Sequence, residues 1–91
     1  MSNQSAWQAR FSRRAERDLD RLDPPIRERM LDAVDGLLVD HPTGDIKRLT
    51  GIKPPEWRLR VGDWRIRFQR EEAARIVEVQ RVLPRGRAYR G

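Results

Sequence analysis

The sequence predicts an α+β fold. It comprises an N-terminal strand, an α-helical hairpin and then a three-stranded antiparallel meander, with the helices packed on one face of the sheet. Two observations carry this prediction. The spacing of apolar residues changes from helical in the first half of the chain to strict alternation after residue 57, and a Gly-Asp pair separates two alternating segments. No repeat or linker interrupts the 91 residues, so we expect a single domain over residues 1–91.

The first half of the chain contains the predicted N-terminal strand and both predicted helices. Apolar residues alternate with polar ones over residues 7–11, as in a short strand. Ser12 occupies the N-cap position of a first helix of about ten residues. Asp23 followed by Pro24 marks the start of a second helix, which we expect to end at His41. The apolar stripe of this second helix consists of Ile26, Met30, Val34, Leu37 and Leu38.

The second half of the chain predicts the meander. Residues 43–53 are expected to form a connection, and residues 76–83 a last strand that ends at Pro84. Between them, a two-residue turn at Gly62 and Asp63 defines the register of a hairpin. The predicted cross-strand pairs are Val61 with Trp64, Arg60 with Arg65, Leu59 with Ile66, and Arg58 with Arg67.

This register puts arginines opposite arginines on one face of the hairpin. Like charges directly opposite one another destabilise a strand pair, by about half a kcal/mol each. Neighbouring acids such as Glu78 or Glu56 could neutralise the face, or an external polyanion could do so. We favour the polyanion, because guanidinium groups present planar, forked donors that suit phosphate and stay charged at any biological pH.

The distribution of charge supports this interpretation. The net charge is +6, yet residues 1–45 hold seven arginines and nine acids, a net of −2, whereas residues 46–91 hold 13 basic residues and five acids, a net of +8. The second half is therefore a candidate polyanion-binding half. A GC-rich genome would explain the preference for arginine over lysine, but it would not explain the asymmetry.

The composition excludes several kinds of site. The chain has no cysteine, which excludes disulfides and thiol nucleophiles, and a single histidine, which excludes a two-histidine ribonuclease. No carboxylate cluster has the spacing of a metal site, so we expect no metal and no other cofactor. No apolar run reaches the length of a membrane span, and we expect a cytoplasmic protein. Trp57 and Trp64 alternate with the arginines and are expected in the core.

Three segments carry a resemblance to a known family. They are the connection Leu49-Thr50-Gly51, the hairpin from Trp57 to Phe68, and the ending from Val82 to Arg90. Together with the order of elements, they resemble the RelE/ParE toxin superfamily of type II toxin-antitoxin systems, and we favour the RelE-like branch. The resemblance implies a toxin neutralised by a cognate antitoxin protein. RelE toxins enter the ribosome and cut mRNA, whereas ParE toxins poison DNA gyrase without catalysis, and a degenerate relative would only bind its antitoxin.

For the RelE-like function, a ribosome-dependent and metal-independent mRNA endoribonuclease, the resemblance implies a set of site residues. Arg65 and Arg85 would clamp the scissile phosphate, and Tyr89 would orient a base and share in proton transfer. RelE enzymes often carry lysines where this chain has Arg58 and Arg60, and arginine does not lose its proton, so the general base is open. Lys53 could substitute for it. The implied catalytic residues are Arg58, Arg60, Arg65, Arg85 and Tyr89, and the implied RNA-binding residues are Lys53, Arg67 and Arg87.

Overall fold

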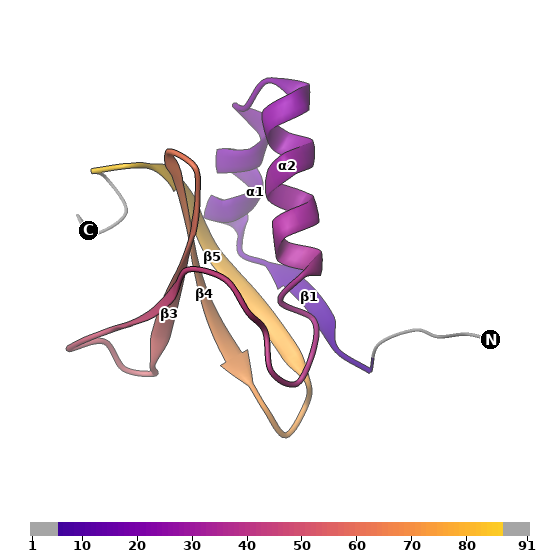
Figure 1. The fold of residues 1–91 in the computed structure, drawn as a ribbon, viewed down its shortest axis with the longest axis vertical. Coiled ribbons are helices and arrows are strands. Elements are labelled where there is room, and N and C mark those ends of the chain that lie inside the picture. Colours follow the sequence, from indigo (N-terminus) through magenta and orange to yellow (C-terminus); the bar gives the residue numbers. More distant parts are fainter. Residues whose placement is uncertain (1–5, 87–91) are drawn as a thin grey trace.

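The computed structural model describes residues 6–86, and in this range it contains two helices and five strands (Figure 1). Neither described helix is long and apolar enough to cross a membrane. In chain order the elements are β1 (Gln8–Phe11), α1 (Arg13–Asp20), α2 (Pro24–Asp35), β2 (Ile46–Leu49), β3 (Glu56–Val61), β4 (Trp64–Glu71) and β5 (Ile76–Pro84).

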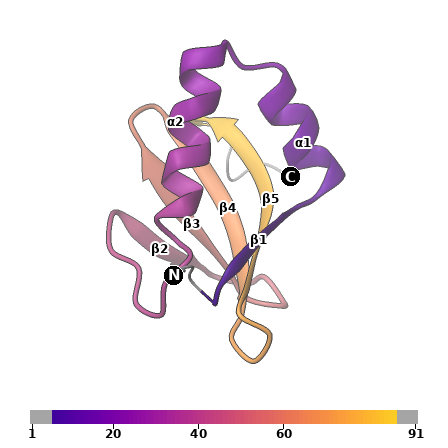
Figure 2. The same ribbon diagram turned by 90° about the vertical axis from the view of Figure 1, so that its right-hand side faces the viewer.

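All five strands belong to one mixed sheet with the order β1-β5-β4-β3-β2. β1 pairs with β5 in parallel, and every other pair is antiparallel. The two helices lie on the same side of this sheet (Figures 1 and 2). The predicted α+β class, with helices covering one face of a mainly antiparallel sheet, is confirmed.

The predicted three-stranded antiparallel meander is present as β3, β4 and β5, but residues 43–53, expected to be a connection, contain the additional strand β2. Ile46 pairs with Leu59 and Leu49 with Glu56, so β2 forms the edge of the sheet beside β3. The four residues of β2 read apolar, basic, basic, apolar and do not alternate. Their strand conformation therefore depends on pairing with β3 rather than on a local pattern.

Both helices are shorter than predicted. Ser12 caps α1 as expected, since its Oγ accepts a hydrogen bond from the Ala15 amide at 3.0 Å, but the helix has eight residues. α2 ends at Asp35, well before His41, because Gly36 follows and glycine is a poor helix former. Asp23 stands at the N-cap of α2, although its side chain makes no capping hydrogen bond.

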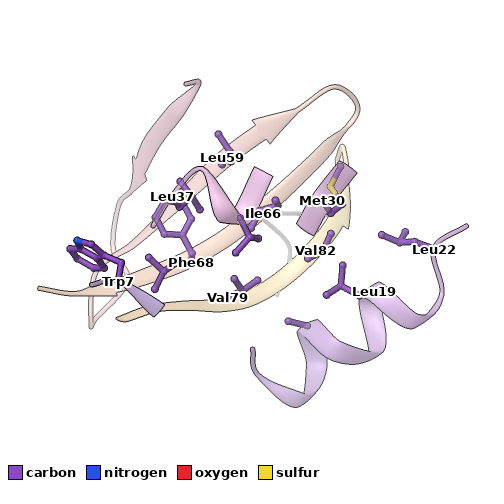
Figure 3. Packing of buried hydrophobic residues seen from close by; sticks show 13 residues of the cluster. Trp7, Leu19, Leu22, Met30, Leu37, Leu59, Ile66, Phe68, Val79 and Val82 are labelled. Carbon is purple, nitrogen blue, oxygen red and sulfur yellow. The ribbon is translucent and has the colours of Figure 1, made fainter. Parts of the chain in front are cut away.

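The hydrophobic core fills the space between the helices and the sheet (Figure 3). Met30 of α2 and Ile66 and Phe68 of β4 belong to this core, and their side chains are fully buried. The Trp57 ring stacks on Phe68 with centroids 6.1 Å apart, so Trp57 lies on the core side of β3, as predicted. Trp64 packs at the margin of the same cluster.

A cation–π cluster joins the exit of α2 to the sheet. The Arg70 guanidinium lies 4.0 Å from the centroid of the Trp7 ring and donates hydrogen bonds to the carbonyls of Leu37 and Val39. The Trp7 Nε1 donates to an Asp40 carboxylate oxygen at 2.8 Å, and this hydrogen bond lowers the pKa of Asp40. Arg70 thus satisfies carbonyl groups of the irregular segment that follows α2.

Asp18 of α1 accepts hydrogen bonds at the edge of β5, beyond the point where β1 ends. β1 pairs with β5 only as far as Val79, so the next part of β5 has no neighbouring strand on that side. There the Asp18 carboxylate accepts a hydrogen bond from the Val82 amide at 2.9 Å and two from the Arg81 guanidinium at 2.8 and 3.2 Å. This buried carboxylate therefore fastens the first helix to the last strand and raises the pKa of Arg81.

We predict that Asp18→Ala lowers the free energy of unfolding by about 3 kcal/mol, because it leaves a largely buried guanidinium and a strand amide without their acceptor. Urea unfolding measures the change. Asp20→Ala removes an exposed carboxylate from the same helix and is the matched control, with an expected change within about 0.5 kcal/mol. An equal loss in both variants would contradict the role of Asp18.

Candidate nucleic-acid interface

The predicted register of the β3–β4 hairpin is confirmed at every pair. Arg58 lies opposite Arg67 and Arg60 opposite Arg65, while Leu59 lies opposite Ile66. Because side chains alternate along a strand and Leu59 and Ile66 are buried in the core, the arginines project from the opposite face of the sheet. We call this set the arginine face: Arg58, Arg60, Arg65 and Arg67.

Internal carboxylates neutralise two members of the arginine face. The Arg67 guanidinium lies 2.9 Å from an oxygen of Glu56, a buried residue that also accepts a hydrogen bond from Gln69. The Arg58 guanidinium lies 2.9 Å from Asp45. Glu56 was one of the neutralising acids considered from the sequence. The repulsion between Arg58 and Arg67 is thus offset within the protein, and the polyanion is not needed for this pair.

Asp45 has a central position in the electrostatics of this face, and the sequence did not identify it. Its carbonyl accepts hydrogen bonds from the Arg58 side chain and the Arg60 amide, both at 3.0 Å. Its carboxylate lies 4.0 Å from the Arg60 guanidinium and is about half exposed, at 53%. The hydrogen bond from Arg58, together with the positive charges of Arg58, Arg60 and Arg65, lowers the pKa of Asp45.

Arg65 is buried without a carboxylate partner. Only 7% of its surface is exposed, and its Nη1 donates to the carbonyls of Gly62 at 3.2 Å and Trp64 at 3.1 Å. Within residues 6–86, no acidic group lies within ion-pair distance of its guanidinium. A buried charge without a carboxylate at ion-pair distance is costly, which makes Arg65 a candidate functional residue.

More arginines gather around the turn between β3 and β4. The Arg85 amide donates to the Asp63 carbonyl at 2.8 Å, which holds the exposed Arg85 beside the turn. Arg29 of α2 approaches from the other side, since a methyl group on Gly62 would lie 3.1 Å from its Nη2. We call this set the basic corner: Arg29, Arg60, Arg65 and Arg85.

The basic corner combines residues that the sequence predicted with one that it did not. Arg60, Arg65 and Arg85 were predicted site residues, and the structure places all three at one end of the sheet. Arg29 was not predicted, because no pattern in the sequence of α2 indicates that the hairpin turn lies next to it. Lys47 was also missed. It lies opposite Arg58 on β2, in the segment expected to be a connection.

Other predicted site residues do not join the basic corner. Lys53 is exposed in the loop before β3, at the end of that strand remote from the turn. A strand of this length extends over roughly 17–20 Å, so Lys53 does not contact the same phosphate as Arg65. Arg67 lies on the arginine face, nearer the middle of β4. Arg87 and Tyr89 lie outside the described residues, and their predicted roles stay predictions.

The arrangement is suited to holding a polyanion. Arginines from two strands, a helix and the position after β5 lie around one turn, and their guanidinium groups stay charged at neutral pH. No group of three His, Cys, Asp or Glu side chains between residues 6 and 86 is arranged to hold a metal ion. The ionisable groups that lie next to the arginine face and can accept a proton include the half-exposed Asp45, the buried Glu56 and, after losing its own proton, Lys47.

Solved structures with a similar fold include toxins of toxin-antitoxin systems. The archaeal RelE–RelB complex from Pyrococcus horikoshii OT3 has a TM-score of 0.73 and 23% identity, over 91% of this chain and 99% of that one. The RelBE2 complex from Mycobacterium tuberculosis has a TM-score of 0.73 and 26% identity, over 87% and 98%. The isolated RelE toxin of E. coli has a TM-score of 0.72 and 20% identity, over 91% and 88%.

The sequence of the chain also matches a known protein family. Residues 9–89 match the family described as the ParE toxin of type II toxin-antitoxin systems, parDE. No protein of curated function matches the chain. The chain belongs to this family of type II toxin-antitoxin toxins. The resemblance to the RelE/ParE superfamily is therefore confirmed, and the likeness of the folds favours the RelE-like branch.

We predict that Gly62→Ala destabilises the protein by about 1–2 kcal/mol, because residue 62 has a φ of +60°, a conformation that L-residues adopt at a cost. The new methyl group would also press on Arg29. Gly36→Ala is the matched control, since the Gly36 φ of −66° suits alanine. Thermal unfolding measures both variants, and a Gly62→Ala protein as stable as Gly36→Ala would contradict this account of the turn.

Proposed function

We propose that the protein is a ribosome-dependent mRNA endoribonuclease that inhibits translation in the cytoplasm and is held in check by an antitoxin. The observation that carries the proposal is the basic corner. There, Arg65 is buried without a carboxylate partner, next to the half-exposed Arg60 and the exposed Arg85. Such a cluster of fixed positive charge has the chemistry that an RNA phosphate requires.

The cleavage in this proposal is attack of a ribose 2′-hydroxyl on the adjacent phosphate. The phosphorus then carries additional negative charge in the transition state, and donors already aimed at that position stabilise it. Arg65 on β4 and Arg85, whose backbone amide contacts the turn, are proposed to supply such donors. Because carbonyl groups hold the Arg65 guanidinium in place, little reorganisation accompanies the reaction. Tyr89 is proposed to stack on a base and share in proton transfer.

Positive charge on the arginine face also suits an antitoxin. Several of the solved structures with this fold are complexes of a RelE-type protein with its antitoxin or an antitoxin peptide. We propose that the cognate antitoxin of this chain carries an acidic segment that covers part of the arginine face. Coverage of the basic corner would exclude RNA and thereby neutralise the toxin.

A second candidate function is inhibition of DNA gyrase without catalysis. The match to the ParE toxin family favours it. So does the pairing of Arg58 with Asp45 and of Arg67 with Glu56, because internal ion pairs leave these arginines less available to RNA. Under this alternative the surface would bind protein, and mRNA would remain intact in growth-arrested cells.

We predict that Arg65→Ala and Arg85→Ala each abolish growth arrest, because each removes a cation from the proposed phosphate clamp, at a cost of roughly 10²–10³ in cleavage rate. Arg14→Ala removes an exposed arginine from α1, on the helical side of the sheet, and is the matched control. Growth after induced expression and primer extension on translated mRNA measure the effect. Circular dichroism establishes that each variant is folded.

Three outcomes separate the candidate functions. Rapid arrest of translation with cuts inside translated codons supports the nuclease. Arrest of replication with intact mRNA contradicts it and supports gyrase inhibition. Full toxicity of both folded clamp variants would remove Arg65 and Arg85 from the site.

A further inference from the structure

The proposed cleavage needs a proton acceptor, and the arginines of the arginine face cannot supply it. Attack by a 2′-hydroxyl requires a base near the phosphate, within hydrogen-bond reach of the hydroxyl. Arginine cannot accept a proton at biological pH, so Arg58 and Arg60 cannot serve. Among the described groups, Lys47 lies opposite Arg58, and two carboxylates pair with the arginine face. Glu56 is buried, with 7% of its surface exposed, and its oxygens accept hydrogen bonds from Arg67 and Gln69, so Asp45 is the accessible carboxylate.

Asp45 has the position that such a base needs. It directly precedes β2, and its carbonyl accepts the Arg60 amide at 3.0 Å, so the β2–β3 pairing extends to this residue. One carboxylate oxygen lies 2.9 Å from the Arg58 guanidinium and the other 4.0 Å from Arg60. With 53% of the Asp45 side chain exposed, a ribose hydroxyl can reach the carboxylate while the neighbouring guanidiniums hold the adjacent phosphate.

We propose that the Asp45 carboxylate is the general base that takes the proton from the attacking 2′-hydroxyl. This inference rests on the proposed nuclease function and names the catalytic group that the sequence left open. Asp45 belongs to the segment expected to be a connection, where no pattern distinguished it from the other acids of the chain. Its proximity to the arginine face follows from the pairing of β2 with β3.

The proposed step balances without a co-reactant. The 2′-oxygen forms a bond to phosphorus as its proton passes to Asp45, and the bond from phosphorus to the 5′-oxygen breaks. The proton then returns from Asp45 to the leaving 5′-oxygen, directly or through water. The products are a 2′,3′-cyclic phosphate on one fragment and a 5′-hydroxyl on the other, and Asp45 ends as the carboxylate with which it began.

Substrate binding would also strengthen this base. In the free protein, the hydrogen bond from Arg58 holds the pKa of Asp45 below its usual value, and the charges of Arg60 and Arg65 act in the same direction. A phosphate that takes the donors of Arg58 brings negative charge and removes that hydrogen bond. Both changes favour the protonated form of Asp45, so its basicity rises when the reaction requires it.

The two lysines fit the role less well. Lys47 lies opposite Arg58 on the edge strand and would have to lose a proton before it could accept one. Lys53 lies in the loop at the far end of β3 from the basic corner.

A carboxylate base and a lysine base give different dependences of the cleavage rate on pH. A lysine base gives a cleavage rate that rises towards alkaline pH, whereas an ionised carboxylate gives a rate that is flat above about pH 6.

The test compares Asp45→Asn with Asp63→Asn on the full-length protein with mRNA-programmed ribosomes. Both changes remove one negative charge near the basic corner, and the Asp63 residue is exposed on the hairpin turn. Asparagine at position 45 keeps an oxygen that can accept the hydrogen bond from Arg58. We expect Asp45→Asn to lower kcat by a factor of roughly 10²–10⁴ without raising KM. Asp63→Asn is expected to cleave like the unaltered protein.

The pH profile separates a base from a residue that only positions Arg58. The unaltered protein is expected to cleave at a constant rate between about pH 6 and 9, while the residual rate of Asp45→Asn rises about tenfold per pH unit as hydroxide replaces the carboxylate. Cleavage by Asp45→Asn at the unaltered rate would overturn the assignment, and so would parallel pH profiles for the two proteins. If the unaltered protein cuts no mRNA, the nuclease function itself fails, and with it the base.

Discussion

The register of the β3–β4 hairpin is the constraint on which the rest of the structure depends. Each strand alternates an apolar residue with an arginine, so a slip of one residue would turn four guanidiniums into the core and move Leu59 and Ile66 towards water. The tight turn at Gly62, with its positive φ, holds the register. One local conformation therefore determines both where the core forms and where the arginine face lies.

Concentrating positive charge on one face has a cost that the protein offsets unevenly. Glu56 pairs with Arg67, and Asp45 pairs with Arg58 and lies 4.0 Å from Arg60. Arg65, by contrast, donates to carbonyl groups of the turn and has no carboxylate within ion-pair distance among residues 6–86. A structure selected only for stability would place a carboxylate beside Arg65, because an unpaired buried charge is unfavourable. Arg65, which lacks such a carboxylate, belongs to the basic corner.

The hairpin was predictable from sequence because period-two alternation and a Gly-Asp turn are local signals. The fold class and the register of Arg60 with Arg65 followed from them. β2 was not predictable, because its four residues show no alternation and become a strand only beside β3. For the same reason the sequence did not associate Asp45 with the arginines. The approach of Arg29 to Gly62 depends on how α2 lies on the sheet, a packing relation that no local pattern encodes.

The most direct test of the account is to observe which guanidinium groups meet RNA. Two-dimensional NMR of the arginine Nε–H signals, recorded during titration with a short single-stranded RNA at low salt, reports on each side chain separately. The account predicts that the signals of Arg60, Arg65 and Arg85 shift together and that the shifts disappear as salt is added. Shifts confined to the arginines of α1, with the basic corner unchanged, would contradict it.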